Sequence, residues 1–149
     1  SLLRQKYDRL VKDRQLSDVT FAGFVPNEEL PRYYAAADVF CAPATGEESF
    51  GMVLLEAMAM GKPVVASAIK GYSQLINSGV DGLLVPPKNE TALAQAIISL
   101  LEDPVLCQNI ALRGRIKAEG YAWENIAGRV MDYYNLLLAK YTSNKRNRV

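Results

Sequence analysis

Three short apolar runs along the middle of the chain constrain the fold more than any other feature. They are residues 38–42 (DVFCA), 63–67 (PVVAS) and 82–85 (GLLV). Each run is continuous rather than alternating, which is typical of strands buried on both faces, and helical patterns separate the runs. Strands that alternate with helices predict βαβ units. We therefore expect a three-layer, Rossmann-like α/β domain with a parallel sheet covered by helices on both sides.

Helix signals flank and separate these runs. Residues 3–14 have the spacing of an amphipathic helix packed by one face, and residues 19–24 are expected to form a further short buried strand. Asn27 is expected to cap the next helix, whose Glu28 and Glu29 suit its positive end. Later helices are predicted over residues 52–60, ended by Gly61, after the cap Asn89, from Pro104 onward, and over residues 123–141.

The aromatic residues and the C-terminal segment are interpreted as structural. Trp123 and the two tyrosine pairs at residues 33–34 and 133–134 lie at helical spacing, so we expect core packing rather than stacking on a base or a sugar. Residues 142–149 are rich in lysine and arginine and are expected to form a flexible basic tail.

Composition narrows the chemistry that this chain can perform. The 149 residues suffice for one domain with a proper core, and a formal net charge of +1 argues against nucleic acid as a partner. The chain contains no histidine, which excludes imidazole metal ligands and the commonest general base. We therefore expect carboxylates, backbone amides or another chain to carry any chemistry.

Two further features of the sequence indicate the cellular compartment of the protein. Cys41 and Cys107 lie far apart in apolar surroundings, a pattern typical of reduced packing residues and not of a disulfide framework. No apolar run reaches the roughly 18 residues that span a bilayer, and the first residues are too charged for a signal peptide. We expect a cytoplasmic protein without a transmembrane segment.

The segment from Ala42 to Met60 is the most informative for function. A loop of small residues follows the strand predicted at 38–42 and leads through Gly51 into a predicted helix. In α/β sheets, ligands bind at the carboxyl ends of strands, where helix amino termini present free N–H groups. We therefore expect an anion at the amides of residues 51–54, which a phosphate can approach closely because Gly51 lacks a Cβ.

Two glutamates flank this expected anion site. Glu56 lies eight residues after Glu48, so the carboxylates would be about 12 Å apart if one helix contained both. That layout suits an extended ligand with phosphates at its centre and hydroxyl groups at both ends, such as a nucleoside diphosphate sugar. Spacing alone leaves a second interpretation open, in which Glu48 only favours the helix dipole and Glu56 is a solvated helix residue.

Five sequence blocks occur in a fixed order. They are residues 21–26 (FAGFVP), 35–43 (AAADVFCAP), 48–58 (ESFGMVLLEAM), 61–67 (GKPVVAS) and 81–87 (DGLLVPP). With these blocks the sequence resembles the donor-binding, C-terminal half of family 4 glycosyltransferases, the retaining GT-B enzymes. Within that family it is most similar to phosphatidylinositol mannosyltransferases. The resemblance covers residues 19 to about 134.

This resemblance implies a role for each matching residue. Glu48, the first glutamate of the family's Glu-x7-Glu motif, would contact hydroxyls of the donor hexose near the reacting carbon, and Glu56, the second, would accept hydrogen bonds from the ribose hydroxyls. The amides of residues 50–53 would hold sugar and diphosphate, and the turn at 25–27 would hold the nucleobase. The donor-binding residues are thus Glu48, Ser49, Phe50, Gly51, Met52, Val53, Glu56, Val25 and Asn27, and Glu48 is the candidate catalytic residue.

The resemblance also implies a reaction. Retaining GT-B enzymes are thought to use the leaving diphosphate itself as the base, so this half would act by positioning and electrostatic stabilisation rather than as a general acid. Such chemistry requires no metal, and the sequence has no Asp-x-Asp cluster. The nucleotide sugar is a substrate, not a cofactor. The mannosyltransferase branch favours GDP-mannose over a UDP-sugar, with a lipid or glycan as acceptor.

Three features of the family have no match in the chain. Nothing before Val19 resembles the family's first two strands and its Gly-Arg…Lys-Gly segment, the acceptor-binding half with its histidine is absent, and residues 70–74 (KGYSQ) replace Gly-Gly-x-x-Glu. We therefore expect residues 1–149 to be a partial donor domain of a two-domain enzyme, inactive without its N-terminal acceptor domain. Peripheral attachment to the cytoplasmic face of a membrane is compatible with this expectation. The alternative is a non-catalytic nucleotide-sugar-binding module that acts through a partner protein.

Overall fold

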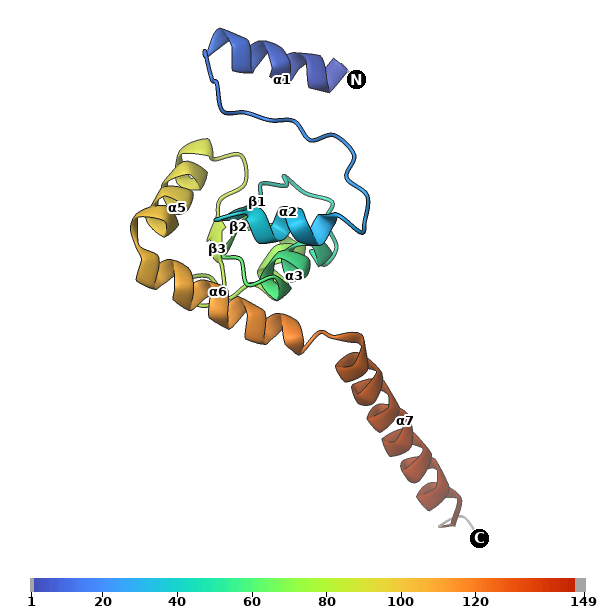
Figure 1. Cartoon of the computed structure of the whole chain (residues 1–149). Coiled ribbons are helices and arrows are strands. Elements are labelled where there is room, and N and C mark those ends of the chain that lie inside the picture. The colour runs from blue at the N-terminus through green and yellow to red at the C-terminus, as the bar shows by residue number, and fades with distance from the viewer. Residues whose placement is uncertain (1, 147–149) are drawn as a thin grey trace. The chain divides into compact units, whose positions relative to one another are not determined.

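The computed structural model describes the backbone of residues 2–146 and the side chains of residues 2–141. The chain divides into two units, residues 1–30 and residues 31–149, and each is described by itself. The elements are α1 (Leu2–Asp13), α2 (Leu30–Ala36), β1 (Phe40–Ala42), α3 (Met52–Ala59), β2 (Val64–Ser67), α4 (Lys70–Leu75), β3 (Leu83–Val85), α5 (Glu90–Glu102), α6 (Pro104–Glu119) and α7 (Trp123–Arg146), and all but α4 are labelled in Figure 1.

The three apolar runs form the parallel sheet that the sequence predicts. Within the described residues the sheet has three strands in the order β1-β2-β3, and both pairs are parallel. Cys41 lies beside Val65, which in turn lies beside Leu83. Each strand begins one or two residues after the start of its predicted run and ends where the run ends. Helices connect successive strands, as βαβ units require.

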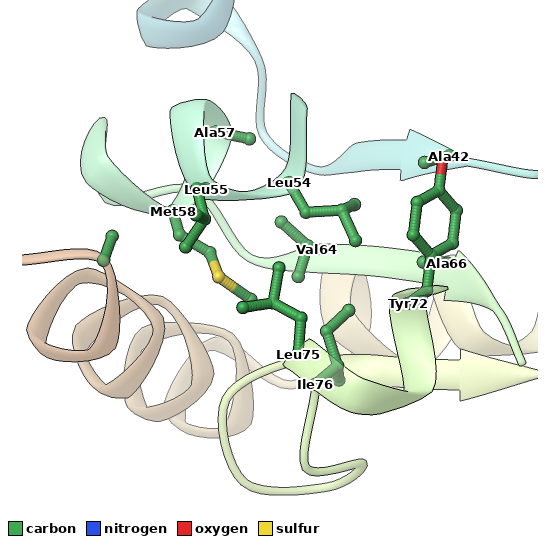
Figure 2. Close-up of a cluster of buried hydrophobic side chains, with 11 residues drawn as sticks. Ala42, Leu54, Leu55, Ala57, Met58, Val64, Ala66, Tyr72, Leu75 and Ile76 are labelled. Carbon is green, nitrogen blue, oxygen red and sulfur yellow. The ribbon is translucent and has the colours of Figure 1, made fainter. Parts of the chain in front are cut away.

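The burial of the central strand β2 explains why the domain has three layers, with the sheet between two layers of helices. All four of its residues are buried, and successive side chains of a strand point to opposite faces. Val64 and Ala66 belong to a cluster with Leu54 and Met58 of α3. Figure 2 shows these side chains together with those of α4. Val65 belongs to the second cluster, on the opposite face, whose other buried members are Val85, Leu100 and Ile110. Helices therefore cover the sheet on both sides, as predicted.

Helix boundaries in the second unit follow their sequence signals. Gly61 follows α3 with a φ of 67°, a left-handed conformation that ends the helix. The side chain of Asn89 accepts a hydrogen bond of 2.9 Å from the amide of Ala92 and so caps α5. Asp103 caps α6 through two such bonds, directly before Pro104. The predicted helices over these segments are confirmed.

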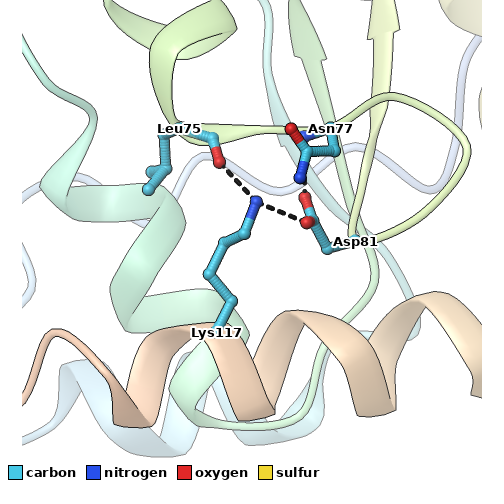
Figure 3. A network of polar contacts seen from close by, with 4 residues as sticks. All are labelled: Leu75, Asn77, Asp81 and Lys117. Atoms are coloured by element: carbon cyan, nitrogen blue, oxygen red, sulfur yellow. Dashed lines mark hydrogen bonds and ion pairs between the residues drawn. The ribbon is translucent and has the colours of Figure 1, made fainter.

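A polar network fixes α6 to the turn that precedes β3 (Figure 3). The ammonium group of Lys117 forms an ion pair with Asp81 and donates a 2.6 Å hydrogen bond to the carbonyl oxygen of Leu75. The other carboxylate oxygen of Asp81 accepts a 2.9 Å hydrogen bond from the amide of Asn77. Because the Asp81 side chain is only 5% exposed, this network holds α6, the partner of α3, in a fixed place.

The first unit differs from expectation in two respects. Residues 19–24 form no strand, and Phe24 is 89% exposed, so the predicted buried strand is wrong for this chain. A strand needs a neighbour to take its backbone N–H and C=O groups, and the described residues of this unit contain no other strand. The predicted helix α1 is present, but none of its described residues is buried.

The helix after Asn27 begins later than predicted. Residues 27–29 form a turn in which the amides of Glu29 and Leu30 both donate to the carbonyl oxygen of Pro26. The helix α2 therefore starts at Leu30, with Pro31 in its first turn as expected.

Most of the aromatic residues expected in the core lie at the surface. Trp123 is 75% exposed, and Tyr33, Tyr133 and Tyr134 are more than half exposed. They lie on faces of α2 and α7 that carry no buried residue in the described structure, so that expectation is wrong for all but Tyr34. The backbone of α7 continues helically through residue 146, and residues 147–149 of the predicted tail lie outside the described residues.

Candidate functional site

The loop and helix that follow β1 bring the predicted site residues together. The chain leaves β1 at Ala42, runs through a loop to Gly51 and enters α3 at Met52. Six of the nine predicted residues, positions 48–53, therefore lie at one loop–helix junction beyond the carboxyl end of a strand, where ligands bind in α/β folds. Ser49, Phe50, Met52 and Val53 are exposed there, and Glu48 is half-buried.

Glu48 binds backbone amides directly before α3. Its Oε1 atom accepts a hydrogen bond from the amide of Gly51 at 3.2 Å and a longer one from Phe50 at 3.5 Å. The carboxylate thus lies at the positive end of the helix, as the second interpretation of the sequence, in which Glu48 favours the helix dipole, predicted. Since α3 begins at Met52, Glu48 lies outside the helix, and the 12 Å estimate for a helix containing both glutamates does not apply.

The loop is held in place from the side by α4. A Cβ atom at Gly71 would overlap the carbonyl oxygen of Glu48, so the α4 backbone packs directly on the loop. At Gly51, whose φ is 90°, a Cβ would lie 2.9 Å from the Tyr72 ring. The absent Cβ at Gly51 therefore admits this ring, a packing reason that sequence reasoning missed. Burial, and then the charge of Glu48, raise the pKa of Tyr72.

Glu56 is exposed on α3 and is bound by a tyrosine from another helix. The hydroxyl group of Tyr34, on α2, donates a 2.7 Å hydrogen bond to Oε2 of Glu56. The Tyr34 ring packs edge-on against Phe40 of β1, with ring centroids 5.4 Å apart. Burial and the neighbouring Glu56 raise the pKa of Tyr34 to about 12, so its hydroxyl remains a donor. Tyr34 was expected only to pack, and no sequence signal distinguished it from Tyr33.

An open groove of about 390 Å³ runs beside Glu56. Met52 and Glu56 line one wall and Arg115 and Glu119 of α6 the other. The remaining lining residues are Leu55, Ala59, Ala118, Tyr121 and Ala122. Glu48 does not line this groove, so the two glutamates lie at different places along the junction. The Phe50 ring contacts that of Tyr121 edge-on, with centroids 5.7 Å apart, which connects the site loop to the groove.

Two of the predicted donor-binding residues belong to the first unit. Val25 is half-buried and Asn27 exposed, and both belong to the first unit, so their part in the site stays a prediction. Cys41 and Cys107 are half-buried free thiols, and burial raises the pKa of Cys41.

The described residues hold neither a metal-binding cluster of side chains nor a membrane-spanning helix. Residues 2–146 contain no cluster of three or more cysteine, aspartate or glutamate side chains that could hold a metal ion. In the same part of the chain, every helix is too short or too polar to span a bilayer.

Comparison with known proteins identifies the family. Residues 3–121 match the model of the family described as Glycosyl transferases group 1. The chain is 39% identical over 116 residues to the phosphatidyl-myo-inositol mannosyltransferase of Mycobacterium leprae, an alignment that covers 78% of this chain and 31% of that protein.

Solved structures agree with this match. Sucrose-phosphate synthase from Thermosynechococcus elongatus superposes with a TM-score of 0.81 at 39% identity, covering 94% of this chain and 35% of that one. Alr3699/HepE of Anabaena, solved in complex with UDP-glucose, superposes with a TM-score of 0.75 at 29% identity, covering 94% and 36%. The chain spans about a third of the length of the relatives it matches.

The parallel α/β fold is that of the C-terminal domains of GT-B glycosyltransferases, as the resemblance implied. The family match covers well over half of the residues. The chain therefore belongs to the group 1 glycosyl transferase family.

Proposed function

We propose that this chain is the donor-binding part of a retaining glycosyltransferase that transfers a hexose from a nucleoside diphosphate sugar to a lipid or glycan. The observation that carries the proposal is the junction at the start of α3. There, a carboxylate and a set of helix amides lie next to each other, and a second carboxylate follows one turn into the helix. A donor with hydroxyl groups on both sides of a diphosphate matches this sequence of groups.

The diphosphate would bind at the first amides of α3. Amides at the start of an α-helix have no partner within the helix, and the helix dipole favours a negative charge there. Met52 and Val53 supply these amides beyond the one that Glu48 already occupies at Gly51. During transfer, negative charge accumulates on the leaving diphosphate, so the same amides would stabilise the transition state more than the bound donor.

The two glutamates would bind the two sugars of the donor. Only the Oε1 atom of Glu48 accepts bonds from the described amides, which leaves Oε2 to accept from a hexose hydroxyl. Glu56 follows Met52 by four residues, a rise of about 6 Å along the helix, so its carboxylate would reach the ribose while the phosphates bind at the amides. In this arrangement Glu48 positions the reacting hexose and Glu56 positions the nucleoside.

We propose GDP-mannose as the donor, because mannosyl transfer is named in the relative from Mycobacterium leprae. The relative from Anabaena was solved with UDP-glucose, so the uracil nucleotides form the competing set. The turn at Val25 and Asn27 is proposed to contact the base. Calorimetric titration of the chain with GDP, GDP-mannose, UDP and UDP-glucose ranks the donors directly, and tighter binding of the uracil pair would replace the guanine assignment.

Substitution of each glutamate tests its assigned partner. Glu56→Gln should weaken binding of the nucleoside diphosphate by about 1 to 3 kcal/mol, because a charged hydrogen bond to the ribose is lost. Glu48→Ala should weaken binding of the sugar-bearing donor more than binding of the nucleoside diphosphate. Glu47→Gln is the matched control, since Glu47 is an exposed neighbour in the same loop. Wild-type affinity of both variants for the nucleotide sugar would remove the proposed roles.

An assay of sugar transfer distinguishes an enzyme from a binding module. When this chain is combined with an acceptor-binding domain, the proposal predicts transfer of the hexose with retained configuration. Chromatography and NMR of the product measure this transfer. Stable donor binding without transfer would instead favour a non-catalytic module that acts through a partner.

A further inference from the structure

Tyr34 connects a helix outside the predicted site to the second glutamate of that site. It lies on α2, twenty-two residues before Glu56, and its hydroxyl donates to Oε2 of Glu56 at 2.7 Å. The ring is half-buried and packs against Phe40, which belongs to the first strand of the sheet. The hydroxyl is therefore held by a ring that is itself anchored on the sheet.

A partner such as Tyr34 is useful if the Glu56 carboxylate must point in one direction to bind a ligand. An exposed glutamate on a helix has three rotatable side-chain bonds and samples several rotamers, and fixing it costs conformational entropy. The Tyr34 hydrogen bond fixes one carboxylate oxygen before any ligand arrives, so less entropy is lost when the other oxygen accepts a ligand hydroxyl. The Tyr34 hydroxyl also keeps the proton that it donates, because burial and the neighbouring Glu56 raise its pKa to about 12.

We propose that Tyr34 is a positioning residue of the nucleotide site: it holds Oε2 of Glu56 so that Oε1 faces the ribose hydroxyls of the donor. This inference rests on the proposed function, and it adds a residue that neither the Glu-x7-Glu motif nor the sequence analysis assigned. Tyr34 does not touch the ligand in this proposal. It acts through Glu56, which distinguishes it from the residues that bind the donor.

Tyr33 offers a matched control for the experiment. It is the neighbouring residue on the same helix, carries the same side chain and is 52% exposed. The described hydrogen bonds and ring contacts of this region include Tyr34 and not Tyr33. Replacing either tyrosine by phenylalanine removes one hydroxyl group and keeps the ring, so only Tyr34→Phe should disturb Glu56.

The test measures whether the variant loses recognition of the ribose hydroxyls in particular. GDP and 2′,3′-dideoxy-GDP are titrated into the unsubstituted chain and the variants Tyr34→Phe, Tyr33→Phe and Glu56→Gln, with the UDP pair in their place if the chain prefers uracil. We expect Tyr34→Phe to lose about five- to tenfold in affinity for GDP and almost nothing for the dideoxy nucleotide. Tyr33→Phe should keep both affinities. Urea unfolding of each variant accompanies the titrations.

The outcomes separate this inference from the proposed function. If Tyr34→Phe weakens both nucleotides equally, or neither, while Glu56→Gln abolishes discrimination between them, the positioning role is overturned and the role of Glu56 stands. If Glu56→Gln still binds GDP more tightly than the dideoxy nucleotide by the same factor, or if the unsubstituted chain binds both equally, the ribose role of Glu56 and the positioning role of Tyr34 are both overturned. A selective loss in Tyr34→Phe supports the positioning role, because a residue that only stabilised the fold would affect both ligands alike.

Discussion

The polar groups of this chain lie in two regions that differ in how completely they are used. In the network of Lys117, Asp81 and the backbone of the turn at 75–77, both carboxylate oxygens have partners and the Asp81 side chain is 5% exposed. At the start of α3, the described bonds engage one oxygen of Glu48 and one of Glu56, and both residues remain accessible. The first region is closed, whereas the second keeps free lone pairs toward the solvent.

This difference separates polar groups that stabilise the fold from those available to a ligand. A buried polar group without a partner is costly, so a closed network cannot lose a member without loss of stability. Accessible carboxylates cost little when unpaired, because water replaces the partner. Substitutions in the closed network should therefore change the free energy of unfolding, and substitutions in the open region should mainly change binding.

The largest effect is expected for Lys117→Met. This change leaves the buried Asp81 carboxylate without its cation and the Leu75 carbonyl without a donor, so the free energy of unfolding should fall by about 3 kcal/mol. Urea denaturation followed by circular dichroism measures the change. Arg115→Met on the same helix is the control, since the Arg115–Glu119 pair is more than 60% exposed on both sides and should contribute at most about 0.5 kcal/mol. Equal losses in the two variants would contradict the distinction between the regions.

The second effect concerns the packing that connects α4 to the open region. Gly71→Ala places a Cβ against the carbonyl oxygen of Glu48, and the backbone must move to admit it. We expect a loss of about 2 kcal/mol in the free energy of unfolding, together with weaker nucleotide binding because the loop shifts.

Gly128→Ala is the opposite case and serves as the control for Gly71. Gly128 lies inside α7, where a Cβ would meet nothing within 4 Å. Alanine is the better helix former by about 1 kcal/mol, so this variant should be as stable as the unsubstituted chain or more stable. Destabilisation by both substitutions would argue against a specific contact at Gly71.

Substitutions of the two glutamates are expected to have smaller effects on the free energy of unfolding. Glu48→Ala removes the acceptor of the partly buried Gly51 amide and should cost about 1 kcal/mol of unfolding free energy. Glu56→Gln keeps an oxygen that can accept from Tyr34 and should stay within about 0.5 kcal/mol. Thermal and urea unfolding of both variants without ligand provide the comparison. A larger loss in Glu56→Gln would assign that carboxylate to the structure rather than to the ligand.

The elements that the sequence predicts well are those whose signals are local or periodic. The runs at 38–42, 63–67 and 82–85 predict buried strands, because short continuous apolar segments that alternate with helical patterns are typical of the parallel sheet of an α/β fold. Caps such as Asn89 and breaks such as Gly61 act within one turn of helix, so their effect does not depend on the rest of the chain.

The failures share one physical cause, the dependence on partners distant in sequence. Residues 19–24 are apolar enough for a strand, yet they form none, since a strand is stabilised by its neighbours and not by its own composition. Trp123 and the tyrosines of α7 have core-like spacing but are exposed, because helical periodicity says which residues share a face and not whether that face is covered.

The candidate site shows the same division. Positions 48–53 were predictable as a unit, because a loop between a strand and a helix keeps its residues together whatever surrounds it. The contacts of Tyr34 with Glu56, of Tyr72 with Gly51 and of Gly71 with the loop join segments about 20 residues apart. Nothing in the spacing of these residues reveals such contacts, which depend on how α2 and α4 pack against the sheet.

The dependence of stability on alkaline pH provides a further comparison. The folded chain raises the pKa of Tyr34 to about 12, whereas a tyrosine in the unfolded chain ionises near about 10. The neutral phenol is therefore favoured by folding, and its contribution to stability is complete below about pH 10 and disappears as the pH rises through about 12. Burial raises the pKa values of Tyr72 and Cys41 in the same direction, so they add a common decline to every variant.

Tyr34→Phe isolates the part of this decline that belongs to the open region. Urea unfolding at about pH 9, 10 and 11 should give a shallower decline for Tyr34→Phe than for the unsubstituted chain, because a titrating group has been removed. Glu56→Gln should fall between them, since it removes the effect of the carboxylate on Tyr34 and leaves the larger effect of burial. Tyr33→Phe should follow the unsubstituted chain. An unchanged slope in Tyr34→Phe would mean that the bond to Glu56 does not persist in solution, and the two regions would then differ by less than their hydrogen bonds indicate.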